Sequence, residues 1–166
     1  MTTQAAQTAQ TAYADHFEID ALVHRFFRAL DERKFEEGWA RAYFTEDVRA
    51  ETPIGTVRGE EAVRHSEEAV GRFERTQHLA SGVLAEAEPG ARTATASWNA
   101  LMAHVHREET LAARGPGAEP VFTVGGLCEA ELRRTEAGWR ISRLAIRALW
   151  TTGRPPVLPE GVAPEV

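Results

Sequence analysis

The 166-residue sequence predicts an α+β fold, in which a curved, mostly antiparallel sheet packs against three N-terminal helices and encloses a pocket. Helical spacing of apolar residues dominates the chain before Arg75, and alternation with a period of two dominates after it. The later strands follow one another through short turns, which favours antiparallel pairing. A sheet curved over helices leaves space for a small ligand.

Composition limits the classes of partner. The formal net charge is −6, with acidic and basic residues interspersed, which argues against a nucleic-acid groove and against a basic membrane-binding surface. No apolar run is long enough to span a bilayer. The one cysteine, Cys128, cannot form an intrachain disulfide and suits the cytoplasm; its strand-like surroundings predict a buried residue.

We expect one domain over residues 15–150. Residues 1–14 are rich in Ala, Thr and Gln, have no signal-peptide features, and predict a flexible, frayed arm. Residues 151–166 are Pro-rich and predict an extended tail.

Three helices are predicted before the strands. The first covers residues 16–33, with Asp15 as its N-cap. The second covers residues 35–44, although Gly38 weakens it, and the third covers residues 59–73. A short hairpin with a Pro/Gly turn is expected between the second and third helices, and four long strands are predicted over residues 76–87, 92–107, 121–134 and 139–150, with a polar loop over residues 108–120.

The strand "SWNALMAHVHRE" carries two of the six histidines. Alternation places Trp98, Met102, His104 and His106 on one face and Asn99 on the other. Both faces are largely apolar, so we expect the strand to be covered on both sides. A buried histidine needs a hydrogen-bond partner, and Asp31, at the end of the first helix, is the candidate for His104.

His104 and His106, with Glu108 next in phase, could also form a metal pair like the H-x-H of cupins. A metal site needs a third protein ligand and a second shell, and cupins are all-β, so we predict no metal and place His106 near the solvent end of its strand. Candidate pocket walls are Trp98, Asn99, Met102, Tyr43, His24 and Phe122; each also has an ordinary structural explanation, such as core packing at strand spacing.

The segments "RALDERKFEEGWARAYFTEDV" and "TQHLASG", with the order of elements, resemble the SnoaL-like branch of the NTF2-like superfamily. Within it the best match is the scytalone dehydratase pattern, which implies a cone-shaped fold, a homodimer or homotrimer, no cofactor, and catalytic roles for Asp31, His78 and His104. The resemblance is imperfect. Leu30 and Thr52 stand where that pattern has tyrosines that hold a water on the substrate carbonyl, so the same substrate is not expected.

Two imidazoles in one pocket can supply a general base and a general acid near neutral pH. We therefore expect a small cofactor-independent lyase or isomerase. It would be a dehydratase, isomerase or polyketide cyclase acting on a mainly apolar carbonyl or polyketide-like intermediate, as in antibiotic biosynthesis. His78 would act nearest the leaving oxygen, with His104, oriented by Asp31, as its partner. A non-catalytic binding or accessory protein and a cofactor-free oxygenase remain open alternatives.

Overall fold

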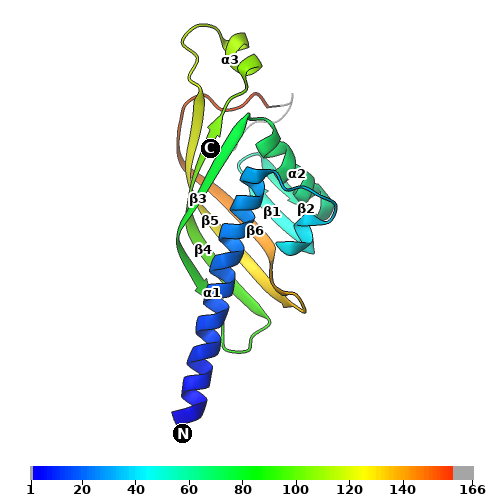
Figure 1. Cartoon of the computed structure of the whole chain (residues 1–166), viewed down its shortest axis with the longest axis vertical. Helices are drawn as coiled ribbons and strands as arrows, with labels where there is room; N and C mark the ends of the chain where they lie inside the picture. The colour runs from blue at the N-terminus through cyan, green and yellow to red at the C-terminus, as the bar shows by residue number, and fades with distance from the viewer. Residues whose placement is uncertain (1, 159–166) are drawn as a thin grey trace.

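The computed structural model describes residues 2–158 and confirms the α+β cone (Figure 1). Six strands form one mixed sheet in the order β2-β1-β6-β5-β4-β3, in which β1 and β6 are parallel and all other neighbours are antiparallel. The elements in chain order are α1 (Thr2–Glu32), the 3-10 helix η1 (Trp39–Ala42), β1 (Phe44–Thr52), β2 (Gly55–Arg58), α2 (Gly59–Gly71), β3 (Arg75–Glu86), β4 (Thr93–Val105), α3 (Glu108–Arg114), β5 (Val121–Thr135) and β6 (Gly138–Thr152).

Helix α1 supplies one wall of the core. Its predicted apolar stripe is buried against the sheet, at Ile19, Leu22, Val23, Phe26, Phe27 and Leu30. The helix begins at Thr2, so the arm expected over residues 1–14 is helical throughout its described part, and its first turns project beyond the sheet (Figure 1). Alanine and glutamine are good helix formers, which explains how the helix continues without core contacts.

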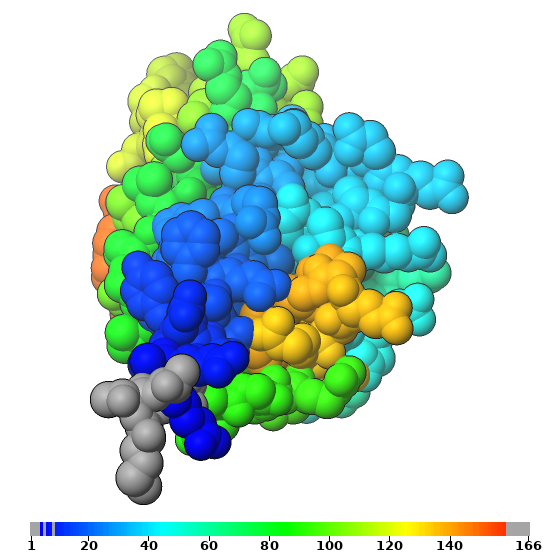
Figure 2. All heavy atoms as spheres, turned by 60° about the horizontal axis from the view of Figure 1, so that its bottom comes forward, coloured from blue at the N-terminus to red at the C-terminus, as the bar shows by residue number. Residues whose placement is uncertain are grey.

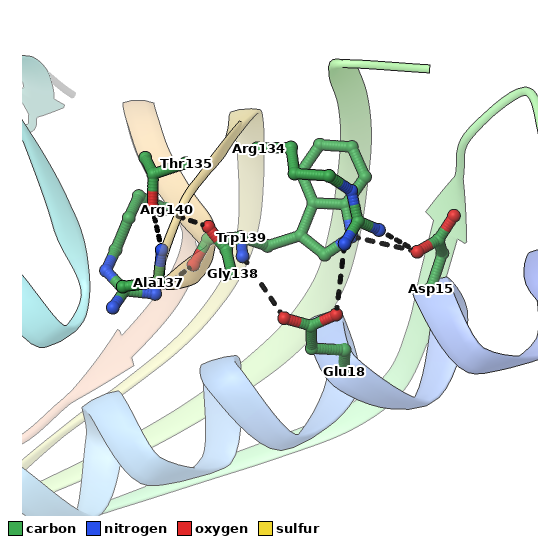
Figure 3. A network of polar contacts seen from close by, with 8 residues as sticks. All are labelled: Asp15, Glu18, Arg134, Thr135, Ala137, Gly138, Trp139 and Arg140. Atoms are coloured by element: carbon green, nitrogen blue, oxygen red, sulfur yellow. Dashed lines mark hydrogen bonds and ion pairs between the residues drawn. The ribbon is translucent and has the colours of Figure 1, made fainter. Parts of the chain in front are cut away.

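Asp15 is not the N-cap that we predicted, because it lies inside α1 and only 4% of it is exposed. Its carboxylate accepts hydrogen bonds from Arg134 and from the Trp139 indole, and the Arg134 guanidinium lies 4.4 Å from the centre of the Trp139 ring (Figure 3). Glu18 adds a second carboxylate, 3.5 Å from Arg134. This network fastens the β5–β6 hairpin to α1, and Figure 2 shows the hairpin lying against the helix.

The second predicted helix is wrong in extent. Only the four residues of η1 are helical, because Gly38 before them adopts a left-handed conformation (φ 77°) and strand β1 already begins at Phe44. Tyr43 packs against Phe26, with ring centres 5.8 Å apart. It therefore belongs to the core, and no contact joins it to the histidines.

The later elements follow the prediction with two corrections. The loop expected over residues 108–120 contains α3, which begins with two acidic residues that complement the helix dipole. Strand β4 is buried on one face only: Trp98 is 1% exposed, whereas Leu101 on the other face is 41% exposed and Asn99 is also exposed. Cys128 is fully buried, as expected, and burial raises the pKa of its thiol to about 12.

After β6 the chain has no regular structure up to Leu158, and the rest of the predicted tail lies outside the described residues. No helix within residues 2–158 combines the length and the apolar character needed to cross a membrane.

Candidate active site

Asp31 and His78 form a hydrogen-bonded pair between the end of α1 and the start of β3. His78 Nδ1 lies 2.6 Å from Asp31 Oδ1, and the His78 backbone N–H donates to Asp31 Oδ2 at 2.8 Å. The Thr76 hydroxyl donates to Oδ1 at 2.9 Å. Because a carboxylate accepts hydrogen bonds, Nδ1 of His78 carries the hydrogen and Nε2 holds the lone pair when the ring is neutral.

The local sequence explains this geometry. Thr76 and His78 are two residues apart on β3, so both side chains point to the same face of the sheet, where the last turn of α1 places Asp31. Phe27, one turn earlier on α1, packs on the His78 ring with centres 5.3 Å apart. The side chains of His78 and Asp31 are 6% and 18% exposed. Burial acts to raise the pKa of Asp31, but the hydrogen bonds and electrostatic attraction of His78, together with the hydrogen bond from Thr76, outweigh it and lower that pKa.

His104 lies beside this pair on β4. Its ring is nearly perpendicular to that of His78, with centres 5.6 Å apart, and it packs on Phe73 at 4.6 Å. Its Nδ1 donates to the Phe122 carbonyl oxygen at 3.2 Å. Burial, followed by the neighbouring His78, lowers the pKa of His104 to about 4, so this ring is neutral near pH 7 and holds its lone pair on Nε2.

The structure therefore brings together the three residues predicted for catalysis but corrects their pairing. Asp31 orients His78, not His104, whose ring is held by a backbone carbonyl instead. The reason is strand register: β3 pairs with β4 so that Thr76 lies opposite His104, and β3 is the strand against which α1 ends.

Five of the residues predicted to line the pocket lie in four different environments. Phe122 is partly buried and its ring lies 5.8 Å from His104, so it borders the site. Trp98 and Met102 fill the core, at 1% and 7% exposure. His24 is half exposed and lines a groove described below. The prediction that Asn99 lines the pocket is wrong, because Asn99 lies on the outer face of the sheet.

A groove runs along the junction of α1 and β3, and we call it the seam groove. It has a volume of about 620 Å³, and Phe27, Asp31, Thr76 and His78 are among its lining residues. It gives the Asp31–His78 pair its access from outside.

Neither substituted position supplies a replacement for the family tyrosines. Leu30 is 7% exposed in the core, and the Thr52 hydroxyl donates to the Gly55 carbonyl in the β1–β2 turn. His106 is also not where we predicted: it is 3% exposed, and its Nε2 lies 2.9 Å from the Arg154 carbonyl oxygen. Within residues 2–158 no three His, Cys, Asp or Glu side chains gather as in a metal site.

Sequence reasoning missed Thr76 and Phe73. Thr76 could have been found, because alternation in "TQH" places it on the same face as His78. The contact of Phe73 with His104 depends on how the end of α2 packs against β4, and no local sequence pattern specifies that packing.

Comparisons with known proteins agree with this architecture. The family model of the SnoaL-like domain matches residues 11–145, whereas no curated protein matches the sequence. A solved structure from Kribbella flavida aligns with a TM-score of 0.75 at 19% identity, covering 84% of this chain and 94% of its own. A candidate scytalone dehydratase from Novosphingobium aromaticivorans gives 0.72 at 20% identity, covering 93% and 99%. A type 3 hexachlorocyclohexane dehydrochlorinase from Novosphingobium barchaimii gives 0.68 at 19%, covering 89% and 96%.

Proposed function

This chain belongs to the SnoaL-like domain family of the NTF2-like superfamily, and from that premise we propose that it is a cofactor-independent acid–base enzyme of the lyase or isomerase type. The observation that carries the proposal is the 2.6 Å contact between Asp31 and His78, with the neutral His104 ring beside it. Two structural neighbours are named for eliminations, of water and of hydrogen chloride, which is chemistry that such a pair can perform.

In this proposal His78 is the general base. The Asp31 carboxylate holds Nδ1–H, directs the Nε2 lone pair away from itself, and stabilises the imidazolium that forms when Nε2 accepts a proton. For a dehydration, His78 removes the proton beside a carbonyl, the carbon–carbon double bond forms as the carbon–oxygen bond breaks, and Nε2–H returns the proton to the departing hydroxyl to give water. One positioned proton transfer of this kind contributes about 10²–10⁴-fold.

His104 has a different role from His78 here. A ring whose pKa is about 4 is a poor carrier of a proton at pH 7, so His104 accepts a hydrogen bond through Nε2 from a substrate hydroxyl and orients it. The same geometry serves a double-bond isomerisation or a cyclisation, in which the proton returns to carbon or to an enolate oxygen.

The surrounding side chains favour a substrate with an apolar body. Phe27, Phe73 and Phe122 pack around the two histidines, and neither Leu30 nor Thr52 offers a phenol to hold a water. We accordingly propose a small carbonyl compound, such as a polyketide-like intermediate of cytoplasmic secondary metabolism, with a substrate different from that of scytalone dehydratases.

The test is turnover of β-hydroxy carbonyl compounds by the wild type and by His78→Ala and His104→Ala variants. His16→Ala is the matched control, because His16 is exposed on α1 and lies outside the site. We expect at least a 10²-fold loss for His78→Ala and near-normal turnover for His16→Ala. Near-normal turnover by folded His78→Ala would refute the proposal.

A second candidate function, non-catalytic binding of a small molecule, is favoured by one observation. Trp98 and Met102 occupy the centre of the cone instead of lining a hollow. Binding without turnover of any carbonyl compound, unaffected by His78→Ala, would support this alternative.

We also propose that the chain forms a homodimer or homotrimer through the outer face of its sheet. Leu101 and Trp150 are 41% and 53% exposed there and lie in one cross-strand row on either side of Gly125. Exposed apolar side chains in one row are a feature of association surfaces.

A further inference from the structure

Helix α1 ends in a conformation that arginine does not favour. Arg33 has a φ of 52° and is the single non-glycine residue with a positive φ within residues 2–158. Its backbone N–H donates to the Leu30 carbonyl, and the N–H of Lys34 donates to the Ala29 carbonyl. This is the pattern of a Schellman motif, in which the position of Arg33 is usually glycine. Because arginine there costs conformational free energy that glycine does not, the reason for an arginine lies in its side chain.

The Arg33 side chain binds the turn between α2 and β3. Its Nη2 lies 2.6 Å from the Phe73 carbonyl oxygen, 3.0 Å from that of Glu74 and 3.3 Å from that of Val70. The last carbonyls of a helix lack donors within the helix, and a cation is favourable at a helix C-terminus. Arg33 therefore fastens the end of α2 to the end of α1.

The ring of Phe73 lies between two imidazoles. Its centre is 4.6 Å from that of His104 and 5.4 Å from that of His106. Phe73 is 3% exposed, yet it does not belong to the main cluster of core side chains. Its position therefore depends on how the turn that carries it is held, and Arg107 adds a hydrogen bond to that turn, at 2.7 Å from the Gly71 carbonyl oxygen.

Phe73 shields His104 from water on one side. Burial is the largest cause of the low pKa of His104, which is about 4, and the Phe73 ring supplies part of that burial. The titratable groups that face His104 are His78 of β3, Asp31 of α1 and His106 directly after β4. The Arg33 side chain hydrogen-bonds none of these groups, so it acts on His104 through the position of Phe73.

We propose that Arg33 is a positioning residue of the active site, which holds the Phe73 ring on His104 and so keeps water away from that imidazole. This inference rests on the proposed function, in which a neutral His104 accepts a hydrogen bond from a substrate hydroxyl. Arg33 also lies two residues after Asp31, so the end of α1 carries both the partner of His78 and the group that shields His104.

Arg33→Gly tests this role directly. Glycine adopts the left-handed conformation without strain, so the fold should be retained, while the three hydrogen bonds to the turn after α2 are lost. We expect the pKa of His104, measured by NMR titration of its imidazole C–H signals, to rise from about 4 by about 1 or more. Arg33→Lys keeps the charge and several donors on one nitrogen, so it should retain most of the low pKa.

Arg72→Ala is the matched control for charge. Arg72 directly precedes Phe73, and its guanidinium donates no hydrogen bond to any of residues 2–158. This variant removes one positive charge from the same turn and should leave the pKa of His104 near 4. A His104 pKa that stays near 4 in folded Arg33→Gly, or that rises equally in Arg72→Ala, would overturn the inference.

The pH profile of turnover separates this inference from the proposed function. If the pKa of His104 rises by about 1, about half of its rings are protonated at pH 5, so turnover at pH 5 relative to pH 7 should fall about twofold below the wild-type ratio. A raised pKa with an unchanged profile would show that Arg33 holds Phe73 but does not serve the reaction. An unchanged pKa together with the loss of turnover in His78→Ala would retain the proposed function and reject the role of Arg33.

Discussion

Asp31 holds His78 by two hydrogen bonds at once, one from the ring Nδ1 at 2.6 Å and one from the backbone N–H at 2.8 Å. The first fixes the orientation of the imidazole, and the second fixes the strand that carries it. The last turn of α1 thus sets both the position and the tautomer of the proposed base.

Asp31→Asn should lower turnover by about 10²-fold or more while the fold is retained. The amide is nearly isosteric but cannot stabilise an imidazolium, and it can hold the wrong tautomer of His78. Imidazole ¹⁵N chemical shifts would report the tautomer directly. A variant that keeps the Nδ1–H tautomer and loses no activity would show that Asp31 does not position His78.

His104 should make the free energy of unfolding depend on pH between about 4 and 6.5. Its folded pKa is lowered to about 4 from an ordinary value of 6.5, so in this window the unfolded chain binds more protons than the folded chain. The contribution of His104 to the free energy of unfolding is fully present above pH 6.5 and is lost as the pH falls towards 4. The free energy of unfolding in urea should differ less between pH 7 and pH 5 for His104→Gln than for the wild type. An equal difference in the two proteins would mean that another group causes the pH dependence.

Arg134→Met should destabilise the fold by about 3 kcal/mol, because it leaves the buried Asp15 carboxylate without its cation (Figure 3). Arg133→Met is the adjacent control: it breaks an exposed pair with Asp47 and should cost less than about 1 kcal/mol. The double variant Asp15→Asn/Arg134→Met should recover part of the loss. An equal loss of unfolding free energy in the two arginine variants would mean that the network between α1 and the β5–β6 hairpin does not stabilise the fold.

Leu101→Lys should convert an oligomer to a monomer, as measured by light scattering coupled to size exclusion. Lysine at Leu101 places a charge in the exposed row that Leu101 forms with Trp150 across Gly125. Lysine at Asn99, on the same face but already polar, should have a smaller effect. An unchanged mass for Leu101→Lys would place the interface elsewhere or indicate that the wild type is a monomer.

Much of the fold was predictable because its signals are local. The apolar stripe of α1 from Ile19 to Leu30 and the alternation of β4 at Trp98 and Met102 are visible as spacing in the sequence. The failures at Asp15 and residues 35–44 have a common cause. An N-cap side chain is also a good partner for a distant arginine, and a short helical spacing cannot show that Gly38 will turn left-handed and that a strand will begin at Phe44.

The sequence allowed the residues of the site to be predicted, but not which of them are hydrogen-bonded to one another. Asp31, His78 and His104 could be chosen from a resemblance and from residue types, yet which imidazole receives the carboxylate depends on the β3–β4 register and on where α1 ends. The burial of His106 likewise depends on residues 48 positions away, at Arg154. Long-range contacts of this kind leave no trace in local spacing.

The central claim is that His78, oriented by Asp31, removes a proton from carbon. Exchange of the proton beside the carbonyl of a ketone ligand in D₂O, followed by NMR, measures this step without requiring a complete reaction. We expect the wild type to catalyse exchange and His78→Gln to lose it by at least about 10²-fold, with His16→Gln unchanged. Exchange at the wild-type rate by folded His78→Gln would contradict the claim.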